Sequence, residues 1–250
     1  MYRFFVDPGS ITDDQVVITG GDVSHISHVL RMKPGDEIVV SCQTDLDYYC
    51  EITSISRDEV VAKVRFTEPQ GRELPISITL LQGLPKGDKM ELIIQKTVEL
   101  GAVRIVPVST SRAVVKLDEK KAKNKVERWN AISEGAAKQS GRGIVPEVTR
   151  VMSLKEALAF VKEEGLTLIV PYENARGMEE LKSLLHSPMK GGYAILIGPE
   201  GGLEQEEVDL ATAAGGRVVS LGSRILRTET AGMALISAMM LEAEMNRVSE

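Results

Sequence analysis

The stretch Tyr193-Ala-Ile-Leu-Ile-Gly-Pro-Glu-Gly-Gly-Leu203 joins an apolar run typical of a buried strand to a glycine-rich turn. Its glycines permit positive φ angles or close backbone approach around the rigid Pro199. Acidic residues at 204, 206 and 207 then suit the first turn of a helix. A buried strand that turns into a helix is the repeating unit of α/β domains. We therefore expect a parallel sheet, with this turn at the carboxyl end of one strand.

A second turn of the same kind follows in the stretch Val218-Val-Ser-Leu-Gly-Ser-Arg-Ile-Leu-Arg-Thr-Glu-Thr-Ala-Gly232, which leads into an Ala/Met-rich helix. Ligands of open parallel sheets bind beyond the carboxyl ends of the strands. One such turn by itself indicates only a tight connection. Two of them, with a polar run from Arg224 to Thr230 inside an apolar region, favour a single ligand pocket built from backbone amides and carbonyls.

Strands and helices alternate from residue 76 to the end of the sequence. The expected strands are 76–82, 103–108, 166–170, 193–197 and 217–221, and the expected helices are 88–100, 122–139, 154–164, 178–185, 205–214 and 229–246. Asp88 with Glu91 three residues later resembles a capping box, and Gly101 is a natural residue to follow a helix end. This alternation predicts an α/β domain with a mainly parallel sheet.

The first part of the chain has a different pattern. Runs of β-branched and aromatic residues at 36–42, 48–56 and 59–66 are separated by turns, which predicts a meander or small barrel. A short helical stretch, 25–32, precedes them. Proline, glycine and charge concentrate in 68–75, which we interpret as the linker between the two parts.

Composition excludes several classes of protein. The chain has 250 residues, of which 43% are hydrophobic and 26% charged, as in ordinary soluble globular proteins. Cys42 and Cys50 are too few for a disulfide framework; reduced thiols, as in a cytoplasmic protein, are expected, although one bridge between them stays open. No apolar run approaches the roughly 18 residues of a membrane span. P-loop, dinucleotide and zinc-protease motifs are missing, and three scattered histidines indicate no metal site. We expect a cytoplasmic protein that has no membrane partner and binds no metal.

Charge is distributed unevenly along the chain. The net charge of −6 argues against a surface that is basic throughout, but residues 86–155 carry +7, whereas 1–85 carry −6 and 156–250 carry −7. A basic segment of this kind is either a solvated helix face or a phosphate-binding surface. Both interpretations remain open from the charges alone.

The two glycine-rich turns, Ile197–Leu203 and Leu221–Ala231, resemble those of the 16S rRNA (uracil-N3)-methyltransferases, the RsmE family of the SPOUT superfamily. Further similar motifs occur in the family's order: His28-Val-Leu-Arg-Met-Lys-Pro-Gly-Asp36, Gln82-Gly-Leu-Pro-Lys-Gly-Asp-Lys-Met90, Gln95-Lys-Thr-Val-Glu-Leu-Gly101 and Ala136-Ala-Lys-Gln-Ser-Gly-Arg142. Together they span nearly the whole chain.

The resemblance implies a mixed α/β protein. A small PUA-like RNA-binding β-barrel is expected at 1–72, and a SPOUT methyltransferase domain with a deep trefoil knot at 73–250. It further implies S-adenosylmethionine as cofactor, 16S rRNA of the small ribosomal subunit as partner, and a homodimer. A SPOUT enzyme acting on another base or on ribose 2′-oxygen, or a non-catalytic RNA-binding assembly factor, remains an alternative.

The resemblance also implies site residues. The positions expected to bind the cofactor are Val170, Pro171, Tyr172, Leu196, Gly198, Gly201, Leu221, Gly222, Ile225, Leu226 and Thr230. The expected RNA contacts are Arg3, Arg31, Lys86, Arg112 and Arg142.

Arg227 and Glu229 are the candidate catalytic residues. Uracil must lose its N3 proton before N3 is methylated, and a lone arginine in an apolar segment suits stabilisation of the resulting negative charge. A structural role for Arg227, paired with Glu229 or with a helix end, is the alternative. The general base stays open between Glu200 and Glu229.

Overall fold

The computed structural model describes residues 1–12, 14–44, 46–187 and 189–247. The chain divides into two compact units. The first consists of Met1–Glu73 together with Ala137–Val145, and the second contains Leu74–Ala136 and the chain from Pro146 onward. None of the helices in the described ranges is long and apolar enough to cross a membrane.

The first unit is built on one sheet. Its strands are β1 (Tyr2–Phe5), β2 (Gln15–Thr19), β3 (Glu37–Ser41), β4 (Leu46–Ile55) and β5 (Glu59–Pro69), in the order β1-β3-β4-β5-β2. β1 is parallel to β3 and the other pairs are antiparallel. Among the described residues no pairing joins β1 to β2, so hydrogen bonds do not close the barrel completely. The sequence patterns predicted β3, β4 and β5 but not the two edge strands.

Alternating residues of these strands form the core of the first unit. Phe4, Ile18, Ile38 and Ile52 are all at most 1% exposed within it. The strands are preceded or joined by short helical turns: η1 (Pro8–Ser10), α1 (Gly21–Ser24) and the π-helical turn η2 (His25–Val29). Arg31, just after η2, has a φ of 54°, which is the left-handed region.

The second unit contains a parallel sheet. Its strands are β6 (Ser77–Gly83), β7 (Arg104–Ser109), β8 (Glu147–Val148), β9 (Met152–Ser153), β10 (Thr167–Pro171), β11 (Gly192–Ile197) and β12 (Arg217–Val219). The order is β12-β10-β11-β6-β7-β8, and β9 also pairs with β7. Every strand pair of this sheet among the described residues is parallel, as the long apolar runs predicted.

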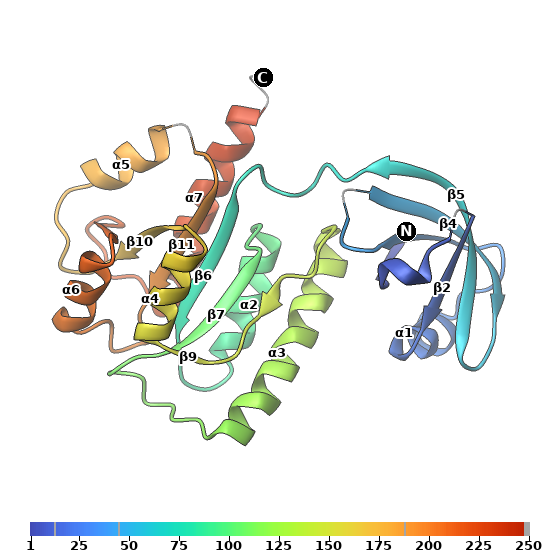
Figure 1. The fold of residues 1–250 in the computed structure, drawn as a ribbon, viewed down its shortest axis with the longest axis horizontal. Helices are drawn as coiled ribbons and strands as arrows, with labels where there is room; N and C mark the ends of the chain where they lie inside the picture. The colour runs from blue at the N-terminus through green and yellow to red at the C-terminus, as the bar shows by residue number, and fades with distance from the viewer. Residues whose placement is uncertain (13, 45, 188, 248–250) are drawn as a thin grey trace. The chain divides into compact units, whose positions relative to one another are not determined.

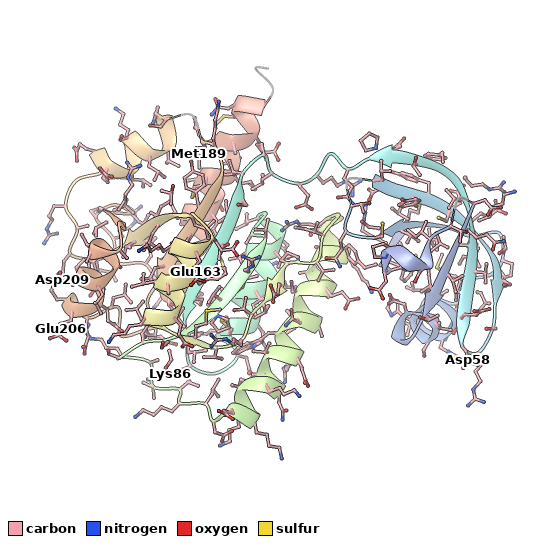
Figure 2. The ribbon with its side chains drawn as sticks, in the orientation of Figure 1. Asp58, Lys86, Glu163, Met189, Glu206 and Asp209 are labelled. Carbon is pink, nitrogen blue, oxygen red and sulfur yellow. The ribbon has the colours of Figure 1, made fainter. Side chains whose placement is uncertain are left out.

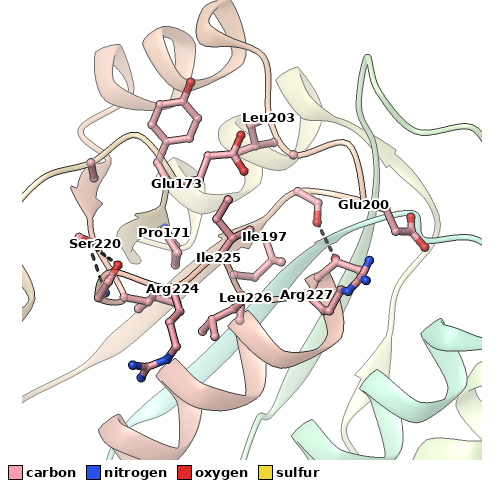
Figure 3. A pocket seen from close by; sticks show the side chains of 18 of the residues that line it. Pro171, Glu173, Ile197, Glu200, Leu203, Ser220, Arg224, Ile225, Leu226 and Arg227 are labelled. Atoms are coloured by element: carbon pink, nitrogen blue, oxygen red, sulfur yellow. Dashed lines mark hydrogen bonds between the residues drawn. The ribbon is translucent and has the colours of Figure 1, made fainter.

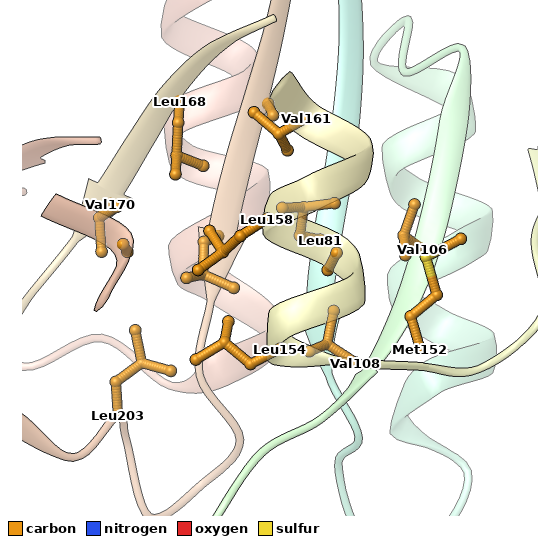
Figure 4. Close-up of a cluster of buried hydrophobic side chains, with 14 of the residues drawn as sticks. Leu81, Val106, Val108, Met152, Leu154, Leu158, Val161, Leu168, Val170 and Leu203 are labelled. Carbon is orange, nitrogen blue, oxygen red and sulfur yellow. The ribbon is translucent and has the colours of Figure 1, made fainter. Parts of the chain in front are cut away.

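Helices cover both faces of this sheet (Figure 1). They are α2 (Lys89–Glu99), α3 (Glu119–Ser140), α4 (Leu154–Glu163), α5 (Glu179–His186), α6 (Gln205–Ala213) and α7 (Thr228–Arg247). Leu154, Leu158 and Val161 of α4 pack with Leu81 and Val106 of the sheet in one buried cluster (Figure 4). α2 and α7 pack against each other, with Gly232 of α7 beside Leu80 and Ile197.

One helix start differs from its prediction. The Asp88 side chain precedes α2 but makes no capping hydrogen bond, and the Glu91 carboxylate, the other half of the expected capping box, pairs with Arg128 at 2.8 Å. A complete capping box occurs at α4, where Ser153 and Glu156 bond each other's backbone amides. A pattern of three residues cannot reveal a competing partner 37 residues away.

Residues 137–145 belong to the first unit although they follow most of α3 in the chain. Arg142 pairs with Glu73, and the Ser41 hydroxyl donates to the Gly143 carbonyl at 2.8 Å. These residues therefore complete the first unit.

Candidate active site

A cavity of about 410 Å³ lies beyond the carboxyl ends of β10, β11 and β12, which are neighbours in the sheet. Three loops surround it, one from each strand (Figure 3). The first supplies Pro171 to Arg176, the second Ile197 to Leu203, and the third Ser220 to Thr228. This is the position at which open parallel sheets bind ligands, and the volume suits a whole cofactor.

The loop after β11 makes close backbone contacts with itself and with its neighbours. A Cβ atom added at Gly198 would lie 2.8 Å from the Gly202 carbonyl carbon, so a larger residue does not fit there. Gly202 has a φ of 71° and its amide donates to the Pro199 carbonyl at 2.9 Å. The Arg112 guanidinium donates to the Gly201 carbonyl at 2.9 Å. The glycines therefore form a compact loop that is held from outside by Arg112.

Glu207, in the first turn of α6, anchors the end of this loop. Its carboxylate accepts the Glu204 amide at 2.9 Å and the Ser111 amide at 2.8 Å, and the residue is only 5% exposed. A negative charge is favourable at a helix N-terminus, where the amides are otherwise unpaired. The acidic run noted in the sequence thus ties the loop after β11 to the loop after β7.

The loop after β12 is joined to the loop after β11 by a buried chain of polar groups. The Gln82 amide donates to the Thr228 hydroxyl at 2.9 Å, and that hydroxyl donates to the Gly198 carbonyl at 2.6 Å. Gln82 is fully buried, and its Oε1 has no hydrogen-bond partner among the described residues. Thr228 begins α7, so this chain fixes the wall of the cavity to the start of that helix.

Side chains of the third loop point in different directions. Ile225 lies near Ile197 and Pro171, whereas Arg224 points away from them (Figure 3). Ile225 is 84% exposed, although it lines the cavity. The loop therefore presents an apolar side chain to the cavity, which suits a flat apolar ring.

Three charged residues cluster beside the cavity. Lys89 Nζ lies 3.0 Å from Glu200 Oε1 and 3.4 Å from Glu229 Oε2. The hydrogen bond to Glu200 is the main reason that the pKa of Lys89 is raised. Burial would raise the pKa of Glu200, but its hydrogen bonds and Lys89 outweigh that effect and the pKa is lowered. Both carboxylates are therefore held by one ammonium group.

The structure brings most of the predicted cofactor-binding residues to this cavity. Those that line it are Pro171, Tyr172, Gly198, Leu221, Gly222, Ile225 and Leu226, together with the catalytic candidate Arg227. Val170 and Leu196 instead lie fully buried in the strands behind it. Gly201, Glu229 and Thr230 are outside its lining.

Of the predicted RNA contacts, Arg3, Arg31 and Arg142 belong to the first unit, and Lys86 and Arg112 to the second. Arg3 is 7% exposed and pairs with Asp47 at 2.5 Å, and Arg142 is 3% exposed and pairs with Glu73. The sequence analysis did not anticipate this burial or the two ion pairs, which are formed inside the first unit. Contact of these two arginines with RNA stays a prediction. Arg31 and Lys86 are exposed.

Several residues of the site were missed from the sequence. Glu173, Arg176 and Ser220 line the cavity, and Gln82 and Thr228 hold its wall. The first three could have been found, because they follow strands whose carboxyl ends were already expected to meet. Gln82 gave no signal, because its role depends on a contact with a residue 146 positions away.

Two families match the chain: an RNA methyltransferase domain over residues 72–240 and an RNA methyltransferase PUA domain over residues 18–65. These matches define the class, a methyltransferase domain of RNA-modifying enzymes joined to a PUA domain.

Relatives narrow this class. The Ribosomal RNA small subunit methyltransferase E of Bacillus subtilis (strain 168) is 41% identical over 99% of both chains, and that of Synechocystis sp. is 33% identical over 92% of this chain and 74% of its own. A crystal structure of the Neisseria gonorrhoeae enzyme bound to S-adenosyl methionine has a TM-score of 0.85 and 34% identity, covering 96% of both chains. The chain belongs to the ribosomal RNA small subunit methyltransferase E family, RsmE.

Proposed function

We propose that this protein uses S-adenosylmethionine to methylate N3 of a specific uridine in 16S ribosomal RNA. The cavity at the ends of β10, β11 and β12 is the observation that carries the proposal. The related enzyme from Neisseria gonorrhoeae, which shares the fold over 96% of this chain, has been crystallised with S-adenosyl methionine. A ribosomal RNA substrate implies a cytoplasmic protein.

The cavity fits this cofactor chemically. Its volume of about 410 Å³ lies within the range of cofactor sites. Ile225 and Leu226 offer apolar contact for an adenine ring, and the backbone groups around Gly222 offer hydrogen bonds. Glu173 and Glu200 in the lining suit positive charge on the ligand, and Arg176 suits its carboxylate. When bound, S-adenosylmethionine supplies an electrophilic methyl carbon on a positively charged sulfur.

Arg227 and the nearby acids act on the uracil. Methyl transfer to N3 requires loss of the N3 proton, which leaves negative charge on the ring oxygens. Arg227 lines the cavity and stabilises that charge, and positioning of the base supplies the remainder of the rate enhancement. Glu200 lines the cavity and Glu229 does not, and Lys89 pairs with both. Glu200 is therefore the better placed of the two acids to accept the proton, and Glu229 keeps Lys89 in position.

The remaining features of the proposal concern the whole chain. Residues 1–72 act as an RNA-binding PUA-like domain and 73–250 as the SPOUT methyltransferase domain, with Arg31 and Lys86 as exposed RNA contacts. The loops after β11 and β12, tied by Thr228, form the trefoil knot of that superfamily. The active protein is a homodimer that associates through α2 and α7, which carry the exposed apolar side chains Leu92, Leu241 and Met245.

The decisive experiment combines methyl transfer with product analysis. The purified protein is incubated with small ribosomal subunits and S-adenosylmethionine carrying a labelled methyl group, and the RNA is digested to nucleosides. We expect label in N3-methyluridine. Label in a 2′-O-methylated nucleoside or another base would refute the stated specificity, and no incorporation would favour a non-catalytic RNA-binding factor.

A variant tests the proposed catalytic residue. Arg227→Ala should lower kcat by a factor on the order of 10²–10³, the usual effect of removing one charge-stabilising donor. Binding of S-adenosylmethionine, measured by calorimetry, should remain near that of the wild type. Unchanged kcat would show that Arg227 has no catalytic role.

A further inference from the structure

A second cavity, of about 200 Å³, lies in the same unit but outside the lining of the first. It is formed by the turn after β6 and the start of α2, by residues 115 and 117 before α3, and by Lys125 and Trp129 within α3. Leu84, Met90, Val115, Leu117 and Trp129 supply apolar walls. Sites that hold a whole cofactor or drug-sized ligand usually have about 300–1,000 Å³, so this cavity suits a single ring system.

The rim of this cavity is basic. Lys125 belongs to the lining, and its Nζ lies 5.9 Å from the centre of the Trp129 ring. Lys86 and Lys116 are exposed and adjoin lining residues in the chain. None of these three ammonium groups forms an ion pair with the residues that the structure describes. Asp88 is the acid of the lining and can accept a hydrogen bond from the polar edge of a base.

The turn after β6 also adjoins the candidate active site. The Lys86 amide donates to Glu200 Oε1 at 3.1 Å and to Oε2 at 3.3 Å, and Glu200 lines the larger cavity. Pro85 and Gly87, on either side of Lys86, line the smaller one. One short turn therefore separates the two cavities, and Lys86 extends from the edge of this unit (Figure 2).

We propose that the smaller cavity binds a base of the substrate RNA that neighbours the methylated uridine. The inference rests on the proposed function. N3 lies on the pairing edge of uracil, so the target must be unpaired and turned out of its stack, which costs stacking energy. Proteins that bind unstacked RNA compensate with apolar and aromatic surfaces for bases and with basic groups for phosphates. Leu117 and Lys125 provide an apolar contact and a positive charge beside the active site, and Trp129, which is 3% exposed, forms the buried inner wall of the cavity.

Two pairs of variants test this assignment. Val115→Trp fills the cavity, and its control is Val114→Trp, because Val114 is 67% exposed and does not line the cavity. Lys125→Gln removes the rim charge, and its control is Lys123→Gln at an exposed position of the same helix. Thermal unfolding shows whether each variant is folded. If Val115→Trp does not fold, Lys125→Gln still tests the inference. Filter binding measures affinity for small-subunit RNA, calorimetry measures binding of S-adenosylmethionine, and labelled methyl transfer measures KM and kcat.

We expect Val115→Trp to weaken RNA binding and raise KM for RNA about tenfold, the size of the loss of one stacked base, with affinity for S-adenosylmethionine unchanged. Lys125→Gln should weaken RNA binding severalfold. Equal RNA affinities for Val115→Trp and Val114→Trp would overturn the inference. A loss of affinity confined to S-adenosylmethionine would also overturn it, and so would a change of oligomeric state without a loss of RNA affinity. Failure of the proposed function is distinct, because the wild type would then transfer no methyl group whatever its RNA affinity.

Discussion

Thr228 shows how much one hydroxyl group contributes to the site. It is 6% exposed, accepts a hydrogen bond from Gln82 and donates one to the Gly198 carbonyl. Thr228→Val removes the hydrogen bond to the Gly198 carbonyl and one of the two that the buried Gln82 amide donates, which should lower the free energy of unfolding by about 1–3 kcal/mol. Because the Gly198 carbonyl belongs to the cavity wall, affinity for S-adenosylmethionine should also fall.

Thr97→Val is the matched control for Thr228→Val. The Thr97 hydroxyl is equally buried, but it bonds the Ile93 carbonyl within one helix, away from the cavity. We expect a smaller loss of stability, because that carbonyl retains a helical backbone partner, and no change in cofactor affinity. Equal cofactor affinities for the two variants, measured by calorimetry, would contradict the positioning role of Thr228.

At the same scale, the sequence predicted the residues that line the cavity better than those that support it. Gly198, Gly222 and Ile225 belong to loops that follow predicted strands, so their meeting follows from sheet geometry. The exposure of Arg3 and Arg142 could not be predicted, because each guanidinium finds its carboxylate 44 or 69 residues away. The type of a side chain indicates what it can bind, but not which residue it pairs with in the folded structure.

Among the elements, α4 offers a test of stability against pH. Hydrogen bonds from the backbone and hydroxyl of Ser153, and then Arg150, lower the pKa of Glu156 to about 2 from 4.5. A carboxylate with a lowered pKa in the folded state stabilises the protein above pH 4.5, and this contribution is lost as the pH falls toward 2. The wild type should therefore exceed Glu156→Gln in stability at neutral pH, and the difference should shrink in acid.

Circular dichroism melts between pH 7 and pH 2 measure this effect. The matched control is Glu163→Gln, at the exposed C-terminal end of the same helix (Figure 2). A negative charge there opposes the helix dipole, so its removal should not destabilise the protein. A stability difference for Glu156→Gln that persists unchanged at low pH would disprove the pKa assignment.

Ser153→Ala should lower the free energy of unfolding by about 1 kcal/mol, as is usual for loss of a helix cap.

The elements themselves were largely predictable, and their exceptions have physical reasons. The long apolar strands and the helices of the second unit follow from hydrophobic periodicity. β1 and β2 were missed because they are short edge strands of 4 and 5 residues, for which local pattern is a weak signal. Their place in the sheet depends on pairing with β3 and β5, far along the chain.

For the molecule as a whole, self-association is the feature to test. Leu241 on α7 is 54% exposed, and α7 packs against α2, which carries Leu92 with 45% exposure. Leu241→Glu places a charge on the proposed contact and should convert a dimer to a monomer in sedimentation experiments. Leu210→Glu on α6, where Leu210 is 44% exposed, should leave the association unchanged. A monomeric wild type would refute the proposed homodimer.

The division of the chain has a consequence for its synthesis. The first unit needs residues 137–145, since Arg142 pairs with Glu73 and Gly143 accepts from Ser41. A domain usually folds as soon as its last residue leaves the ribosome. Here the first 73 residues must wait while β6, α2, β7 and most of α3 are translated. The N-terminal unit is therefore synthesised first but cannot complete its fold until residues 137–145 have been translated. In a nascent chain stalled before residue 137, we expect this unit to be cleaved readily by proteases.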